Sequence, residues 1–307
     1  RKEWEQSDMG IMTIGACDVP RGCDASENDL KYILSFTEVK TCVVENSTQI
    51  KKIMNVKNDI PTLKQFIIFD QISDEVQSLC DASNVKIYTF QQILDLGKAF
   101  TEKNPNRVNE EIEKGQWDDI AAIIFTSGTT GTPKGVMLSH GNFITQLDEL
   151  QERIYLYPGD KAICVLPVWH VFQRLVEYVI LSQAASICYS KPIGSVLLPD
   201  MLKLNPTLLP AVPRVFEAVY EGVKKKMRRT GEIVEGLFNF FTSVAILHSR
   251  ISRRLFRKNF RTKYDFIVLS WIFLVIPWIL LAPLKALGNV LVFKKVKAML
   301  GTNFRAG

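Results

Sequence analysis

Short apolar runs alternate along the first two-thirds of the chain with segments whose apolar residues recur every three or four positions. The short runs predict strands, and the recurrence predicts amphipathic helices. Predicted strands cover residues 41–45, 65–70, 120–126, 135–139, 162–167, 185–189 and 207–212. Predicted helices cover residues 28–35, 47–57, 89–97, 141–154, 171–181 and 213–229, with a polar linker at 103–113. This alternation predicts an α/β fold of layered, largely parallel sheets with flanking helices.

The pattern changes after about residue 229. Residues 232–261 predict a long helix in which apolar residues are interleaved with arginines, and residues 266–284 follow without a charge. As a helix, these nineteen residues would be about 28 Å long, close to the roughly 30 Å of a bilayer core. Pro277 would kink the helix, and Trp271 and Trp278 would suit a membrane interface. Three interpretations stay open: a helix that spans a membrane, one that lies in its plane, or a buried core helix.

This pattern predicts three regions. Residues 1–229 form an α/β domain, 230–300 a long helical, basic and hydrophobic insert near the C-terminus that is a candidate for membrane association, and 301–307 a return to the first domain. The chain begins at Arg1 inside a helix-like pattern and ends at Gly307 without a terminal helix or cap. We therefore expect it to be an internal portion of a longer protein.

Composition and charge limit the partners and the cellular location that we expect for the chain. The 307 residues are 47% hydrophobic and 23% charged, as in a globular protein, with a net charge of +6. Twelve Lys and Arg residues lie between 224 and 263, which indicates either a solvated helix face or a surface for an anionic membrane. That run lacks a recognised nucleic-acid motif, so we expect no nucleic-acid partner. Six scattered cysteines without a C-x-x-C pair predict a reducing, cytoplasmic location, with membrane attachment through 266–284.

The candidate chemistry lies in residues 125–135, Phe-Thr-Ser-Gly-Thr-Thr-Gly-Thr-Pro-Lys-Gly, at the end of a predicted buried strand. Gly128 and Gly131 let the backbone approach a ligand closely, and Lys134 supplies a compact positive charge. Hydroxyl groups come from Thr126, Ser127, Thr129, Thr130 and Thr132. Free N–H groups and hydroxyls in a loop of small residues are typical of a phosphate site.

The spacing excludes a Walker-type loop. Pro133 precedes the lysine and Gly135 follows it, so no Ser or Thr is placed to hold magnesium as in G-x-x-x-x-G-K-[ST]. The residues after Lys134 predict a second strand, and strand–loop–strand is not the strand–loop–helix of P-loop nucleotide hydrolases.

At these residues the sequence resembles the adenylate-forming superfamily, the AMP-binding enzymes that include acyl-CoA synthetases. The family signature, an aromatic residue followed by T-S-G-T-T-G-x-P-K-G-V, is present at residues 125–136. The resemblance implies part of an N-terminal domain in which the loop, from Thr126 to Lys134, holds the ATP phosphates. Thr126 would lie beside Mg²⁺, and Lys134 and Thr126 would be catalytic. A carboxylate attacks the α-phosphate, pyrophosphate leaves, and a thiol such as that of CoA displaces AMP.

Two further segments resemble the long-chain fatty acid group of this family. Residues 166–174 read L-P-V-W-H-V-F-Q-R, which makes Trp169 a candidate gate of an acyl tunnel and His170 a candidate contact of the acyl carboxylate. Gln173 stands where that group usually has Glu. The alternative is a core aromatic residue and a satisfied buried histidine. The V-P-R-V-F-E segment at 212–217 carries the same resemblance.

The resemblance implies a long-chain fatty acid–CoA ligase that uses ATP, Mg²⁺ and CoA, with a long-chain fatty acid and a membrane surface as partners. An acyl-(acyl carrier protein) synthetase is the close alternative, and a catalytically inactive membrane-binding fragment is an alternative of another class. The family's Y-G-x-T-E segment, its ribose-binding aspartate and its C-terminal domain with the adenylation lysine are not among these residues. We therefore expect the 307 residues alone not to adenylate a fatty acid.

Overall fold

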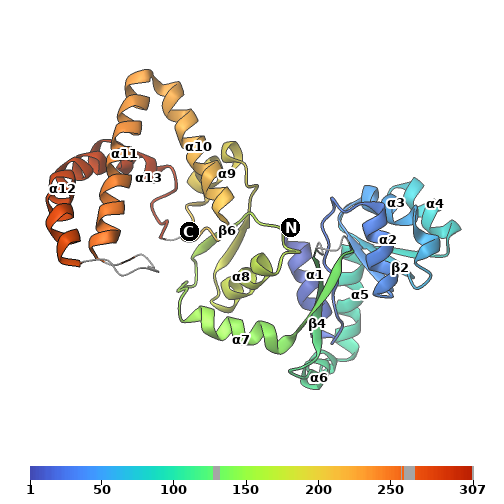
Figure 1. Cartoon of the computed structure of the whole chain (residues 1–307). Helices are drawn as coiled ribbons and strands as arrows, with labels where there is room; N and C mark the ends of the chain where they lie inside the picture. Colours follow the sequence, from blue (N-terminus) through green and yellow to red (C-terminus); the bar gives the residue numbers. More distant parts are fainter. Residues whose placement is uncertain (127–131, 257, 259–266, 306–307) are drawn as a thin grey trace. The chain divides into compact units, whose positions relative to one another are not determined.

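A computed structural model describes residues 1–126, 132–256, 258 and 267–305 (Figure 1). The chain forms two compact units. The first contains Arg1–Tyr155 and Pro167–Val179, and the second contains Leu156–Leu166 and Ile180–Gly307. The predicted boundary at residues 229 and 230 falls inside the second unit, and the three-region division stays a prediction.

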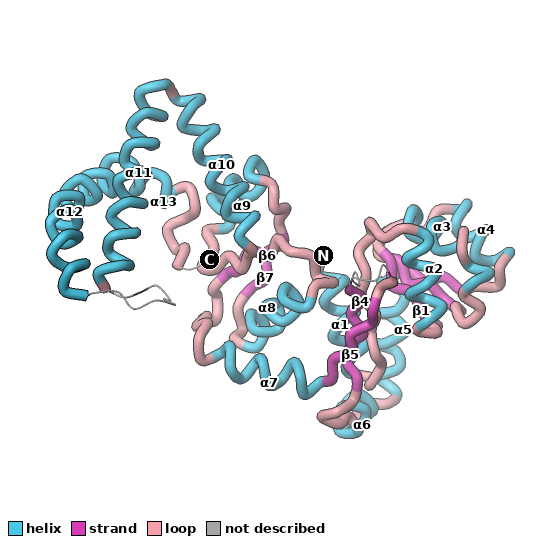
Figure 2. The backbone as a smooth tube through the Cα atoms, in the orientation of Figure 1, coloured by secondary structure: helices cyan, strands magenta, loops and turns pink. Residues whose placement is uncertain are grey.

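A parallel sheet with helices packed against it forms one part of the first unit (Figure 2). Its strands β1 (Thr41–Val44), β2 (Gln65–Ile68) and β3 (Lys86–Thr89) pair in that order. Alternate residues of β1 and β2 are buried, and they share a core with α2 (Glu27–Phe36), α3 (Ser47–Met54) and α4 (Asp74–Ala82). A short helix, η1 (Lys57–Asp59), follows α3. Ser26, Asn46 and Ser73 cap the three helices, because each side-chain oxygen accepts a backbone N–H of the first turn.

An antiparallel hairpin forms the other part of the first unit. Strand β4 (Ile120–Thr126) pairs with β5 (Lys134–Ser139). Buried Ala121, Ala122 and Ile124 pack against residues of α1 (Lys2–Thr13), α7 (His140–Gln151) and α8 (Val171–Ser182). The small side chains of β4 let these helices approach the strand closely.

The predicted linker at 103–113 is wrong. Helix α5 (Phe90–Lys103) ends there, and α6 (Arg107–Lys114) occupies most of the segment. Arg107 and Lys114 both pair with Glu111, at 2.5 Å and 2.8 Å, one helical turn away on either side. Such pairs stabilise a helix none of whose residues is buried.

The second unit begins with the parallel strands β6 (Lys161–Cys164) and β7 (Ser186–Tyr189). Helices α9 (Gly194–Leu204) and α10 (Pro213–Thr230) follow, with a shared core that includes Ile163, Leu197 and Val215. The predicted strand at 207–212 is wrong: only Leu208 forms an isolated bridge, with Ala162.

A set of helices completes this unit: α11 (Glu232–Leu255), α12 (Ile267–Gly288), the π-helical turn η2 (Asn289–Phe293) and α13 (Lys294–Ala298). Helices α11 and α12 lie side by side as a hairpin (Figure 1). Pro277 and Pro283 lie inside α12, which continues through both.

The chain after α13 returns to the end of α9. The side-chain oxygen of Asn205 accepts hydrogen bonds from the backbone N–H of Thr302, at 2.7 Å, and of Asn303, at 3.1 Å. Asn205 has a left-handed backbone, with φ of 49°, which an asparagine tolerates better than most residues. The chain from α10 to α13 therefore leaves and returns at one place.

Candidate active site

The candidate phosphate loop lies between β4 and β5, as the sequence predicts. Thr126 and Lys134 are register partners at the loop end of the hairpin, and both side chains are exposed. Thr132 is also exposed. Ser127, Gly128, Thr129, Thr130 and Gly131 lie outside the described residues. The structure thus brings together one hydroxyl and one ammonium group at the two ends of the loop.

Phe125 and Gly135 form the base of the loop. The Phe125 ring is buried and makes edge contacts with Tyr32 and Phe36, with centroids 6.2 Å and 6.3 Å away. A Cβ atom on Gly135 would lie 2.9 Å from Ile123 Cγ2 and 3.1 Å from Phe125 Cζ. The glycine is therefore required so that β5 can pass close to the ring.

Trp169 is half-buried against Gly22, where an added Cβ atom would come within 2.6 Å of indole Cζ2. Asp18 forms a parallel bridge with Ala122, so residues 18–22 run in the direction of β4. Trp169 consequently lies toward the end of β4 that carries Thr126.

His170 is exposed at the start of α8, so it is not a buried histidine. Its Nδ1 atom accepts the backbone N–H of Phe172 at 3.3 Å, which fixes the ring at the helix N-terminus and leaves Nε2 for a ligand.

A buried ionic cluster holds α8 in place beneath the hairpin. Arg174 is fully buried, pairs with Asp8 of α1, and donates to Asp18 Oδ1 at 2.8 Å. Tyr178 donates to Asp8 Oδ2 at 2.5 Å, and the guanidinium lies 5.4 Å from the Phe143 ring. The cluster joins α1, the segment before Gly22, and α8, and so positions the end of α8 that carries His170.

Gln173 belongs to a second buried group beside this cluster. Its Nε2 atom donates to Glu177 Oε1 at 2.8 Å, and both side chains are fully buried. Glu5 of α1 faces them: burial first, and then the hydrogen bond and charge of Glu177, raise the pKa of Glu5 to about 8. Glu5 is therefore protonated at neutral pH. A Glu at position 173, as in the family pattern, would add a third carboxylate beside Glu5 and Glu177. The amide of Gln173 adds none, which gives the departure from that pattern a physical reason.

The family model of the AMP-binding enzyme matches residues 1–262 of the chain. The chain belongs to this family. Among curated proteins it is 28% identical, over 97% of its length, to the long-chain-fatty-acid–[acyl-carrier-protein] ligase AEE15, chloroplastic, of Arabidopsis thaliana. It is also 28% identical, over 84% of its length, to long-chain-fatty-acid–CoA ligase 5 of Rattus norvegicus.

The chain covers 42% of the first relative and 37% of the second. Among solved structures it is similar to the A domain of a carboxylic acid reductase from Segniliparus rugosus, in complex with AMP and a carboxylic acid. That match has a TM-score of 0.58 and 17% identity, and it covers 78% of this chain and 40% of the other. It establishes the adenylate-forming fold.

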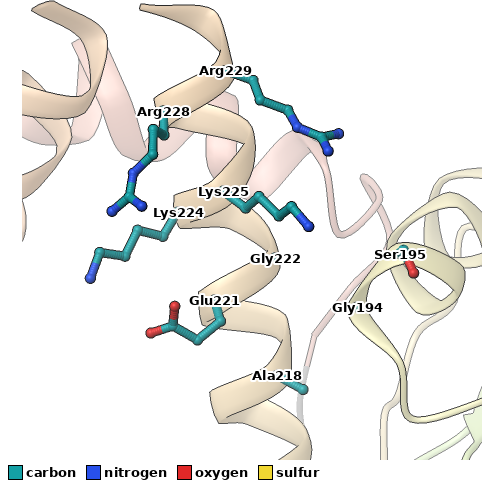
Figure 3. Close-up of a pocket in the computed structure, with 9 residues that line it drawn as sticks. All are labelled: Gly194, Ser195, Ala218, Glu221, Gly222, Lys224, Lys225, Arg228 and Arg229. Atoms are coloured by element: carbon teal, nitrogen blue, oxygen red, sulfur yellow. The ribbon is translucent and has the colours of Figure 1, made fainter. Parts of the chain in front are cut away.

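The chain also has a basic groove in its second unit, between α9 and α10, with a volume of about 520 Å³ (Figure 3). Lys225 and Arg229 lie on the side of α10 that faces Ser195, whereas Lys224 and Arg228 point away from it. The residues that line this groove belong to the second unit, whereas the hairpin belongs to the first.

No group of three or more His, Cys, Asp or Glu side chains is placed to hold a metal among the residues that the structure describes. A hydroxyl such as that of Thr126 could supply one oxygen ligand to a magnesium–nucleotide complex whose other ligands are phosphate oxygens and water. Mg²⁺ commonly binds in that way, with few protein ligands.

Proposed function

We propose that this protein activates a long-chain fatty acid with ATP and transfers the acyl group to CoA. The observation that carries the proposal is the pairing of Thr126 with Lys134 at the loop end of the β4–β5 hairpin, within a chain of the AMP-binding family. The names of the relatives, which include fatty acid–CoA ligases, support the choice of substrate.

Attack of a carboxylate on the α-phosphate of ATP breaks the bond to pyrophosphate, which leaves with the negative charge. The Lys134 ammonium and the Thr126 hydroxyl, which the hairpin places opposite each other, would stabilise that charge as it develops. Bound Mg²⁺ would supply further charge neutralisation at the phosphates. The rate enhancement assigned to this site is therefore mainly electrostatic.

Trp169 and His170 are proposed to contact the acyl substrate. Trp169 lies toward the Thr126 end of β4 and offers an apolar face, and the exposed His170 ring is fixed by its contact with the Phe172 N–H. An imidazole N–H can donate a hydrogen bond to a carboxylate.

The thiol acceptor is proposed to be CoA, with acyl carrier protein as the second candidate. The relatives include proteins named for each acceptor. Incubation of the full-length protein with fatty acid, ATP and either CoA or holo acyl carrier protein distinguishes them by the thioester that forms.

Membrane association is part of the proposed function, because a fatty acid partitions into lipid. Within the described residues, one helical stretch, Trp271–Ala298, is long and apolar enough to cross a membrane by length and composition. The cytoplasmic location stays a prediction, and relatives are named chloroplastic or peroxisomal.

The test of the activation step is ATP–pyrophosphate exchange that depends on a long-chain fatty acid. Replacing Lys134 by Ala removes the positive charge beside the leaving group, so we expect exchange to fall by roughly 10²–10³-fold, as for the loss of one preorganised donor. Lys134 is exposed, so stability should change little.

The matched control is Lys98→Ala, which removes an exposed lysine of α5 and should leave exchange intact. Exchange that is absent from the unaltered full-length protein would favour the inactive membrane-binding alternative. Equal activity of both variants would remove Lys134 from the reaction.

A further inference from the structure

The exposed side of α12 is entirely apolar or aromatic from residue 271 onward. Its exposed residues recur every three or four positions and so share one face of the helix. Apart from Trp271, whose ring contacts Phe256, they are Ile272, Phe273, Ile276, Ile279, Leu280, Pro283, Leu284, Ala286 and Leu287. A helix at a water-facing surface normally carries polar side chains on that side, so this outer face of α12 is a candidate interaction surface.

The opposite side of α12 carries its polar contacts and packs against α11. Lys285 Nζ lies 3.3 Å from His248 Nδ1, and the imidazole stacks on Trp278 with ring centroids 5.5 Å apart. Burial and the nearby ammonium lower the pKa of His248, so the neutral ring can accept from Lys285. A Cβ on Gly288 would lie 2.7 Å from Phe241 Cδ1, which shows how closely the two helices pack.

Helix α11 is in turn fixed to the second unit. Phe238 and Phe241 are buried with Val223 and Met227 of α10. The last two turns of α11 expose several arginines, among them Arg250 and Arg253. If α12 crossed a bilayer together with α11, these charges would enter it at high cost. If α12 crossed alone, Lys285 would lose His248.

The charges near the apolar stretch favour an anionic surface. Lys258 lies before α12, and Lys294, Lys295 and Lys297 follow it, all exposed. No Asp or Glu occurs from residue 266 to 307. Lysines that flank an apolar helix face can contact lipid phosphates while the face enters the acyl region.

We propose that α12 lies in the plane of an anionic membrane, with its outer face inserted into one leaflet and α11 on the aqueous side. The hairpin keeps its internal contacts in this arrangement, and neither end of α12 crosses to the other side. The proposal rests on this surface and is independent of the ligase activity, which its tests do not measure.

The first test is flotation of the full-length protein with vesicles of phosphatidylcholine, with and without phosphatidylserine. We expect binding to the vesicles that contain phosphatidylserine, weaker in high salt. The double variant Ile276→Glu/Leu280→Glu should lose more than about tenfold in binding, because two apolar side chains that would enter the lipid become charged. Ile233→Glu, at an exposed apolar position at the start of α11, is the matched control and should bind normally.

The second test distinguishes an in-plane helix from a spanning one. Lys258→Cys places a thiol before the N-terminal end of α12, and Lys295→Cys places one after its C-terminal end. An impermeant maleimide is then added outside sealed vesicles. Peptide mass spectrometry separates these thiols from the native cysteines. We expect both positions to be labelled without detergent, whereas a spanning helix would protect one of them.

Three results would overturn the proposal. The first is unchanged binding of the Ile276→Glu/Leu280→Glu variant with a native circular dichroism spectrum. The second is protection of one engineered thiol until detergent is added. The third is an unaltered protein that binds no vesicles, which would assign the face to a second copy or to another part of the protein.

Discussion

At the scale of single residues, Lys134 and Thr126 pair at the loop end of one hairpin, and a continuous sequence signature predicts both. The partners of Arg174 have no comparable signal, because Asp8 and Asp18 lie 166 and 156 residues away. A charged residue predicts a surface position by default, so only the fold reveals that these three are buried together. The residues that flank the candidate phosphate loop can thus be predicted from the sequence, whereas the buried residues that support it cannot.

Glu5 gives a pH-dependence prediction at this scale. Its pKa rises from 4.5 to about 8 on folding, through burial and the adjacent Glu177 and Asp8, while Arg174 opposes the shift. The folded protein therefore holds a proton that the unfolded chain releases. We expect the free energy of unfolding to fall as pH rises from about 5 to about 8, as measured by urea denaturation. Glu5→Gln should make that dependence less steep, and Asp18, whose pKa burial raises to about 7, should account for the remainder.

Glu102→Gln, at an exposed position of α5, is the control and should leave the pH profile unchanged. A Glu5→Gln profile as steep as that of the unaltered protein would contradict the assignment.

At the scale of elements, the sequence identifies those that carry a regular apolar period, such as β4 and α10, within a few residues. It misses α9, because Gly194 begins the helix and Pro199 lies inside it, and both residues disfavour a helix in isolation. It also misses α6, whose stabilisation comes from ion pairs, and it assigns a strand at 207–212 where most residues lack a pairing partner. Tertiary packing and side-chain pairs override the local pattern in these cases.

The contact between α9 and α10 yields a prediction with an internal control. A Cβ on Gly194 would lie 2.8 Å from the backbone oxygen of Ala218, whereas one on Gly222 would meet the end of Leu198 at 3.1 Å. The backbone oxygen of Ala218 cannot move aside as easily as the flexible end of the Leu198 side chain. We therefore expect Gly194→Ala to destabilise the protein by about 1–3 kcal/mol.

Gly222→Ala should be nearly neutral, because the gain in helix propensity offsets a small shift of Leu198. Guanidinium denaturation of the two variants measures the difference. Equal loss of stability in both would show that the helices do not pack as closely as described.

At the scale of the whole molecule, the sequence identifies the apolar stretch 266–284 as a candidate for membrane association. It does not decide whether that stretch spans a membrane, lies in its plane or is buried in the protein. That choice depends on which side of α12 faces α11, and so on His248, a residue 37 positions from its partner Lys285. The clamp that Asn205 forms by its hydrogen bonds to residues 302 and 303 cannot be predicted from the sequence either, because its partners lie far away along the chain.

Asn205 provides the prediction at this scale. Asn205→Ala removes the hydrogen bonds to residues 302 and 303 and strains a left-handed backbone, whereas Asn205→Gly removes only the bonds. Both variants should expose the segment after α13 to trypsin at Arg305. We expect the alanine variant to be the less stable by roughly 1 kcal/mol, as judged by denaturation. Unchanged cleavage at Arg305 would mean that Asn205 does not hold the returning chain.

The Asn205 clamp also has a consequence for insertions into the chain. Helix α10 packs in the same core as β6, whereas α11 to α13 lie between the end of α10 and the return of the chain at Asn205. The length of α11 to α13 is therefore not tied to the register of β6 and β7. Because lengthening such a closed segment costs little in entropy, insertion of a helical turn there should leave the pairing of the two strands intact.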